Sequence, residues 1–97
     1  MLAAARRTVQ RFLNAANPQE IVFVRGTTEA INLVAQSHGR QMVNQGDRVV
    51  ATELEHHSNL LPWQMLCKER NAEFCLAPID ANGDLDMQAL GHLLIPR

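Results

Sequence analysis

The sequence predicts an α/β fold, a three-layer arrangement in which a partial parallel sheet is flanked by helices. Two observations predict it. Short apolar runs alternate with amphipathic runs of helical period, in the order α-β-α-β-α-β-α, and the connections between them are short. Of the 97 residues, 46% are apolar, which is enough for the core of one small unit covering residues 1–97.

The first helix is predicted over residues 2–16, because apolar residues recur there at helical spacing with arginines on the opposite side. Pro18 stops this helix, since the residue before a proline avoids the α region. The apolar run IVFV that follows predicts a first short buried strand over residues 20–24.

Residues 25–28 predict a turn into a second helix, over residues 28–39, and residues 48–52 predict a second strand. A polar segment, 53–59, follows this strand. Ser58 or Asn59 is expected to cap the third helix, which has Pro62 in its first turn.

Asn71 is expected to end that third helix, and residues 74–79 form an apolar run suited to a third strand. The segment DANG at 80–83 has the composition of a turn. Asp86 is expected to cap the last helix, whose inner face would carry Met87, Leu90, Leu93 and Leu94.

Two polar clusters, residues 25–28 and 53–59, follow the first and second predicted strands. Ligands of parallel sheets gather at the carboxyl ends of the strands, so the two clusters are interpreted as one site. Gly26 is expected to allow a sharp turn and a close approach to a ligand. Thr27 and Thr28 would then place backbone N–H groups and hydroxyls at a helix start, where an anion such as phosphate is stabilised. Without further information, Thr27 and Thr28 could equally form an ordinary helix cap.

Two longer segments that include these clusters resemble the group II cysteine desulfurases. These segments are FVRGTTEAINLVA at 23–35 and EHHSNLLPWQML at 55–66. Group II cysteine desulfurases are pyridoxal-phosphate enzymes of the class V aminotransferase family, and selenocysteine lyases look alike at these positions. The resemblance extends over essentially the whole chain.

The resemblance implies that Thr27 and Thr28 bind the phosphate of pyridoxal 5′-phosphate. It also implies that His56 stacks on the cofactor ring and can transfer a proton. The implied reaction converts L-cysteine to L-alanine and an enzyme-bound persulfide, which supplies sulfur for iron–sulfur clusters. The implied partners are a sulfur-acceptor protein and a second copy of the enzyme in a cytoplasmic homodimer.

Parts of the family's machinery have no counterpart in this sequence. Lys68 is the only lysine. It is interpreted as a solvated lysine on a helix and not as a lysine that forms the Schiff base. The chain is therefore expected to be a partial large domain without the family's N-terminal segment, Schiff-base lysine region or C-terminal small domain, and to be inactive alone. Residues 21–24 and 49–52 would lack sheet neighbours, so they are expected either to pair directly or to promote self-association.

Three alternatives remain open: a selenocysteine lyase, another class V transferase, or a non-enzymatic remnant. His56 and His57 could also be an exposed or capping pair, and the spacing of the histidines indicates no metal site. A formal net charge of −1 argues against nucleic acid as a partner, and no apolar run is long enough to cross a membrane. Cys67 and Cys75 are interpreted as packing residues.

Overall fold

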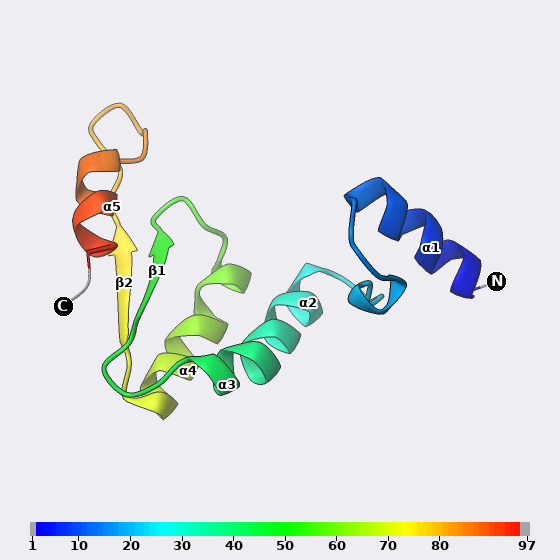
Figure 1. The fold of residues 1–97 in the computed structure, drawn as a ribbon. Helices are drawn as coiled ribbons and strands as arrows, with labels where there is room; N and C mark the ends of the chain where they lie inside the picture. The colour runs from blue at the N-terminus through cyan, green and yellow to red at the C-terminus, as the bar shows by residue number, and fades with distance from the viewer. Residues whose placement is uncertain (1, 96–97) are drawn as a thin grey trace.

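The computed structural model describes residues 2–95. Figure 1 shows an elongated molecule in which the N-terminal helix lies at one end and the sheet at the other. The elements, in chain order, are α1 (Leu2–Leu13), a 3₁₀ turn (Pro18–Glu20), α2 (Thr27–Val34), a π-helical segment (Ala35–Gly39), α3 (Arg40–Met42), β1 (Arg48–Thr52), a second 3₁₀ turn (His57–Asn59), α4 (Leu61–Arg70), β2 (Glu73–Ala77) and α5 (Met87–Leu93).

Strands β1 and β2 form a two-stranded parallel sheet, with Arg48 opposite Glu73 and Thr52 opposite Ala77. The crossover between them contains α4, as a parallel pair requires. The ladder continues one residue beyond β1, where the Glu53 N–H donates to Ala77 O at 3.0 Å. Because the strands are parallel, both of their carboxyl ends lie at one edge of the sheet.

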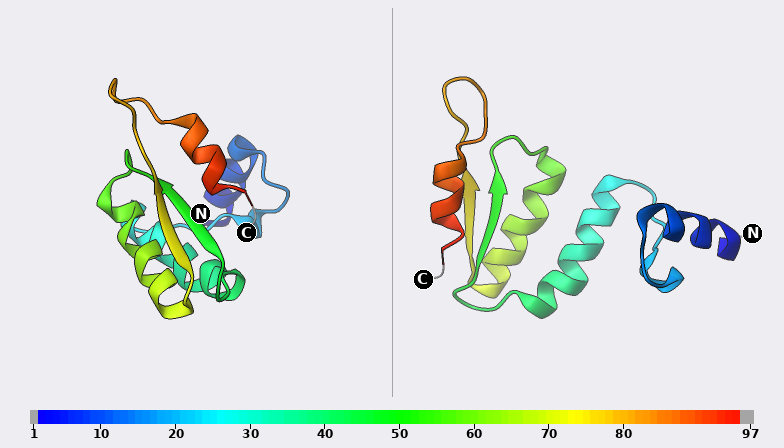
Figure 2. Two further views of the ribbon diagram at one scale, coloured as in Figure 1. Left: turned by 90° about the vertical axis from the view of Figure 1, so that its left-hand side faces the viewer. Right: turned by 45° about the horizontal axis from the view of Figure 1, so that its top comes forward.

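Helices cover both sides of this sheet. In Figures 1 and 2, α5 lies on one side of the two strands, and α4 lies on the other side with α2 beyond it. This is the three-layer α/β arrangement that the sequence predicts, and that prediction is confirmed. The buried apolar residues are few: Ile21, Ala35, Leu66, Cys67 and Ala77.

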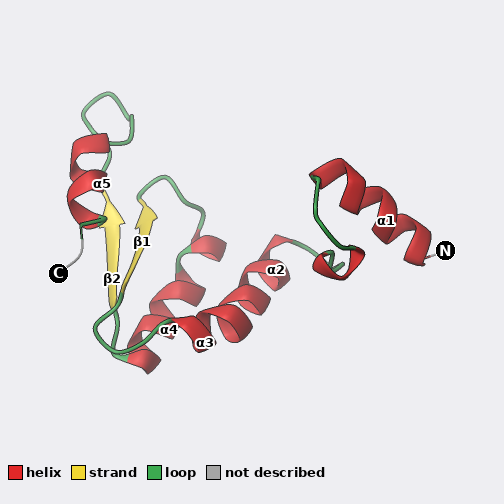
Figure 3. Cartoon of the chain, viewed as in Figure 1, coloured by secondary structure: helices red, strands yellow, loops and turns green. Residues whose placement is uncertain are grey.

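The strand predicted over residues 20–24 is wrong. Glu20 belongs to a 3₁₀ turn, and residues 21–24 are a loop on the far side of α2 from the sheet (Figure 3). Among the described residues this segment has no ladder partner, and a strand is defined by its partner and not by apolar sequence alone. Of the two alternatives expected for residues 21–24 and 49–52, direct pairing is wrong for the same reason.

The second helix is longer than predicted. It begins at Thr27, passes through the π-helical segment and continues as α3 to Met42. The third strand is shorter than predicted and ends at Ala77. Proline has no N–H to donate to a ladder, so Pro78 ends β2.

Of the other expected helix boundaries, three are confirmed and two are wrong. The first helix, expected to reach residue 16, ends at Leu13. Pro62 lies in the first turn of α4, and Asn71 ends that helix in the left-handed conformation, with φ 55° and ψ 39°. The Asp86 carboxylate caps α5 by accepting from the Ala89 N–H at 3.0 Å. Neither Ser58 nor Asn59 caps α4, because a 3₁₀ turn capped by His56 precedes it and Leu60 occupies the N-cap position.

Candidate functional site

The structure brings the two polar clusters together. The first turn of α2 packs against the 3₁₀ turn that follows β1, and a hollow of about 150 Å³ lies between them. Thr28 and Asn32 line this hollow from α2, and His57 and Ser58 line it from the 3₁₀ turn. The rest of its wall is apolar and comes from the α4 residues Leu61, Pro62 and Met65. Thr27 and His56 are exposed and are not among its lining residues. The two sequence motifs are therefore neighbours in space, although the residues that line the hollow include Thr28 and His57 and not Thr27 and His56.

The start of α2 is open to a ligand. Its N-cap residue, Gly26, has an extended backbone with φ 175° and ψ −176°, and no side chain caps the helix. A Cβ added at Gly26 would meet nothing within 4 Å. The chain bends at Arg25 and Gly26 as expected, but any residue can adopt this extended conformation, so the bend itself does not require glycine. The structure also shows free space at the Cβ position of Gly26, beside a helix start that no side chain caps.

An ion pair lies beside this helix start. Glu29, in the first turn of α2, accepts from the Arg25 backbone N–H at 3.4 Å, and its carboxylate lies 3.7 Å from Arg25 Nε. Both side chains are exposed, so the pair contributes little to stability. The arginine nevertheless offsets the negative charge of Glu29 next to the helix start, where an incoming anion would be repelled by an unpaired carboxylate.

The His56 ring is held by the turn that it caps. Its Nδ1 accepts from the Ser58 backbone N–H at 3.1 Å and lies 3.1 Å from Ser58 Oγ. Since a backbone N–H can only donate, Nδ1 carries no proton, and the neutral ring carries its proton on Nε2. The His56 and His57 rings are 6.1 Å apart and tilted by 56°, so His57 does not stack on the face of His56.

Glu55 and Asn59, which belong to the predicted 53–59 cluster, form a hydrogen-bonded ladder with Trp63, a residue that the sequence did not place in the site. Trp63 Nε1 donates to Asn59 Oδ1 at 2.8 Å, and Asn59 Nδ2 donates to Glu55 Oε2 at 3.1 Å. The residues are spaced four apart, and that spacing was the available signal.

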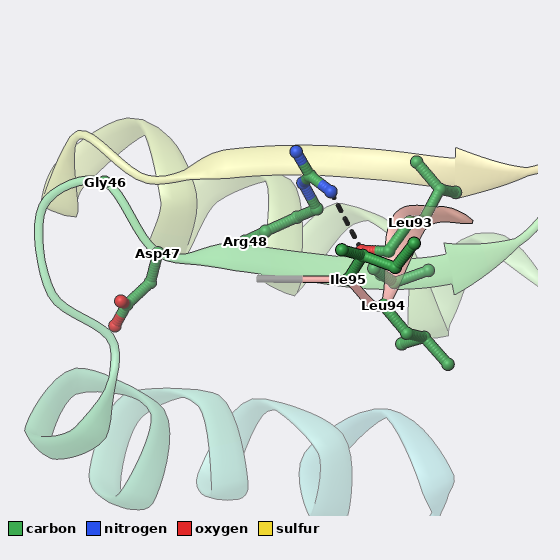
Figure 4. A pocket seen from close by; sticks show the side chains of 7 residues that line it. Gly46, Asp47, Arg48, Leu93, Leu94 and Ile95 are labelled. Atoms are coloured by element: carbon green, nitrogen blue, oxygen red, sulfur yellow. Dashed lines mark hydrogen bonds between the residues drawn. The ribbon is translucent and has the colours of Figure 1, made fainter. Parts of the chain in front are cut away.

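A second hollow, of about 430 Å³, lies at the opposite end of the sheet, between the start of β1 and the end of α5 (Figure 4). Arg48 projects beside it and donates from Nη1 to Leu93 O at 2.9 Å. Arg48 Nε also lies 3.6 Å from Oε2 of the Glu73 carboxylate. This hollow is at the amino end of β1, so it does not belong to the site that contains Thr28 and His57.

Neither cysteine lies at the candidate site. Cys67 is buried in α4, and burial raises the pKa of its thiol because the thiolate would be poorly solvated there. The Cys75 thiol donates to Glu73 Oε1 at 2.9 Å, and Lys68 is exposed on α4. Across residues 2–95, no three histidine, cysteine or acidic side chains gather as metal ligands, and no helix has the length and apolar character to span a membrane.

Comparisons with known proteins identify the family. The family model for aminotransferase class-V matches residues 1–97. A cysteine desulfurase from Pectobacterium carotovorum is 51% identical over 96 residues, which cover 99% of this chain and 24% of the relative. A cysteine desulfurase from Yersinia pestis strain Pestoides F is 48% identical over 93 residues, covering 96% of this chain and 23% of the relative. The chain thus spans about a quarter of the length of the curated relatives that it matches.

Solved structures agree with the sequence relatives. The cysteine desulfurase CsdA of Escherichia coli, in its S-sulfonic acid form, superposes with a TM-score of 0.84 at 40% identity, over 97% of this chain and 24% of that one. The apo cysteine desulfurase of Thermococcus onnurineus NA1 superposes with a TM-score of 0.78 at 37% identity, over 90% of this chain and 21% of that one. The chain therefore belongs to the class V aminotransferase family, and these sequence relatives and structural neighbours within it are cysteine desulfurases.

Proposed function

We propose that residues 1–97 are part of the large cofactor-binding domain of a pyridoxal-phosphate-dependent cysteine desulfurase. The observation that carries the proposal is the packing of the uncapped start of α2 against the turn that bears His56 and His57. Together with the match to cysteine desulfurases over nearly the whole chain, this packing supports a single ligand site built from both motifs.

In this proposal, Thr27 and Thr28 bind the cofactor phosphate. The space at Gly26 and the uncapped N–H groups suit a phosphate, because the helix dipole and the free donors both favour an anion there. The two threonine hydroxyls can add hydrogen bonds to phosphate oxygens. The residues present therefore fit the phosphate of pyridoxal 5′-phosphate.

His56 is the proposed partner of the cofactor ring. Its imidazole is exposed, no face of it is stacked on His57, and its Nε2 carries the proton when the ring is neutral. A planar ring in this state can stack on a pyridine ring and hold or move a proton at Nε2. Bound pyridoxal phosphate would supply the electron sink for carbanion chemistry at the substrate.

Further elements of the proposal lie beyond this chain. Lys68 is exposed on α4, so we assign the Schiff-base lysine to a segment outside residues 1–97, together with the cysteine that receives sulfur. We also propose the family's N-terminal segment and C-terminal small domain as missing parts. L-cysteine is the proposed substrate, a sulfur-acceptor protein and a second subunit are the proposed partners, and the cytoplasm is the proposed location. The chain alone is proposed to be inactive.

A chimera tests the proposal. Residues 1–97 would replace the matching quarter of E. coli CsdA, and cofactor absorbance and alanine formation from L-cysteine would be measured. We expect the chimera to retain both. The variant Thr27→Ala/Thr28→Ala should lose cofactor, and His56→Ala should lose turnover more than cofactor content. A chimera that folds but neither binds cofactor nor forms alanine would overturn the assignment. The ratio of rates on selenocysteine and cysteine would decide between a lyase and a desulfurase.

A further inference from the structure

The ladder from Trp63 through Asn59 to Glu55 has only one possible polarity. The indole N–H can only donate, so the Asn59 oxygen must face Trp63 and accept at 2.8 Å. The Asn59 amide nitrogen then faces Glu55 and donates to the carboxylate at 3.1 Å. A bond to an ionised acceptor is stronger than a neutral one, although water competes for the exposed Glu55 carboxylate.

The other end of the ladder is anchored in the helical layer. Trp63 is half-buried, and its Cζ3 lies 3.5 Å from the position that a Cβ would occupy at Gly39. Gly39 ends the π-helical segment that continues from α2, the helix that begins at Thr27. One tryptophan therefore contacts the helix that carries the threonines and bonds to the turn that carries the histidines.

His56 lies within the span that the ladder closes. Glu55 precedes it directly and Asn59 follows three residues later, and the Asn59 backbone N–H also donates to His56 O at 2.8 Å. Inside the same turn, His56 Nδ1 accepts from the Ser58 N–H. A change in the position of Asn59 would therefore shift the backbone that sets the direction of the His56 ring.

We propose that Glu55, Asn59 and Trp63 are positioning residues that hold the His56 imidazole with Nδ1 bonded to the turn and the proton on Nε2. The inference rests on the function proposed for His56, but it concerns the ring before any cofactor binds. If the ladder merely stabilised the start of α4, its disruption would lower stability and leave the tautomer of His56 unchanged.

Two substitutions break the ladder and then restore it. Asn59→Asp keeps an acceptor for the Trp63 N–H but places a second carboxylate opposite Glu55. Adding Glu55→Gln supplies an amide that can donate to the new carboxylate, which reverses the polarity of the bond and restores it. Glu55→Gln alone keeps an acceptor for the Asn59 amide. Gln88→Glu, on an exposed position of α5, is the matched control for the added charge.

The readout is the His56 ring in ¹⁵N-labelled chain, followed by long-range ¹H–¹⁵N correlation at about pH 8, above the ordinary histidine pKa. We expect an unprotonated Nδ1 in the unsubstituted chain, in Glu55→Gln and in Gln88→Glu. Asn59→Asp should mix the two tautomers and speed hydrogen exchange of the Ser58 amide roughly tenfold. The double variant should restore both signals. Unchanged His56 signals in a folded Asn59→Asp chain, or a folded double variant without recovery, would overturn the proposal.

Should Asn59→Asp unfold the chain, Trp63→Phe provides the same test, because it removes the indole donor and keeps an aromatic ring at position 63, although the Cζ3 atom near Gly39 is lost with the larger ring. A mixed tautomer supports the ladder, and an unchanged ring refutes it. Since no cofactor is present in these measurements, their failure would leave the proposed function intact. Failure of cofactor binding in the chimera would in turn leave the ladder intact.

Discussion

Gly39 and Leu66 are in closer contact than an alanine at position 39 would permit. A Cβ added to Gly39 would lie 2.7 Å from Leu66 Cδ2, and Leu66 is fully buried. The backbone of Gly39 is ordinary right-handed helix, with φ −60° and ψ −47°, so conformational freedom does not explain the glycine. Its function is to let the helix that begins at Thr27 approach α4 closely.

Gly39→Ala is expected to destabilise the chain by about 1 kcal/mol. Overpacking a buried contact costs roughly 1–3 kcal/mol, and the higher helix propensity of alanine returns roughly 1 kcal/mol at most. Gly91→Ala is the control, because a Cβ at this α5 residue meets nothing within 4 Å and should stabilise the chain. Urea unfolding of both variants would check the signs, and a stabilising Gly39→Ala would show that Leu66 yields easily.

Asp86→Ala is expected to lower the free energy of unfolding by about 1 kcal/mol, because it removes the side-chain acceptor of the Ala89 N–H at the start of α5. Asp86→Asn keeps an acceptor and should retain most of the stability. The same urea titration would measure both variants. Equal losses in the two would mean that the charge of Asp86, and not its cap, is what stabilises α5.

The success of the Asp86 prediction and the failure at residues 21–24 have a common explanation. Caps and breaks such as Asp86, Asn71 and Pro62 depend on a few neighbouring residues, so the sequence is sufficient to predict them. A strand requires a partner, and the apolar run at 21–24 does not show whether one is present.

The candidate site likewise has features that the sequence predicts and features that depend on tertiary packing. The positions of Thr27, Thr28 and His56 at strand and helix ends could be predicted from their motifs. The shared hollow that Thr28 and His57 line could not be predicted, because it depends on how α2 packs against the turn before α4. The bond from Trp63 to Asn59 could be predicted only in part: the spacing of four permits it, but the direction of the indole N–H depends on packing.

Cys67 predicts a pH dependence of stability and reactivity. Burial raises the pKa of its thiol above the unfolded value, so the native state holds this proton more tightly. The resulting stabilisation is fully present below the unfolded pKa and is lost as the pH rises through the higher native pKa. Cys67→Ala should flatten the alkaline side of the stability curve, measured by urea unfolding from neutral to alkaline pH.

In the native chain, Cys67 should also be alkylated more slowly than the less buried Cys75. Equal alkylation rates would contradict this.

The 97-residue chain is expected to self-associate in solution. Large apolar side chains are exposed along the described residues, among them Phe12 at 87%, Leu13 at 61% and Val22 at 63%. The radius of gyration is 16.3 Å, against roughly 13 Å for a compact domain of this size, so much apolar surface is left without intramolecular cover. Sedimentation velocity at increasing concentration should show growing species, and Phe12→Ser/Val22→Ser should reduce them. Thr8→Ser, on the same helix, is the control and should change nothing. A single monomeric species at every concentration would contradict the expectation. It would mean that the exposed apolar residues are too scattered to form an association interface.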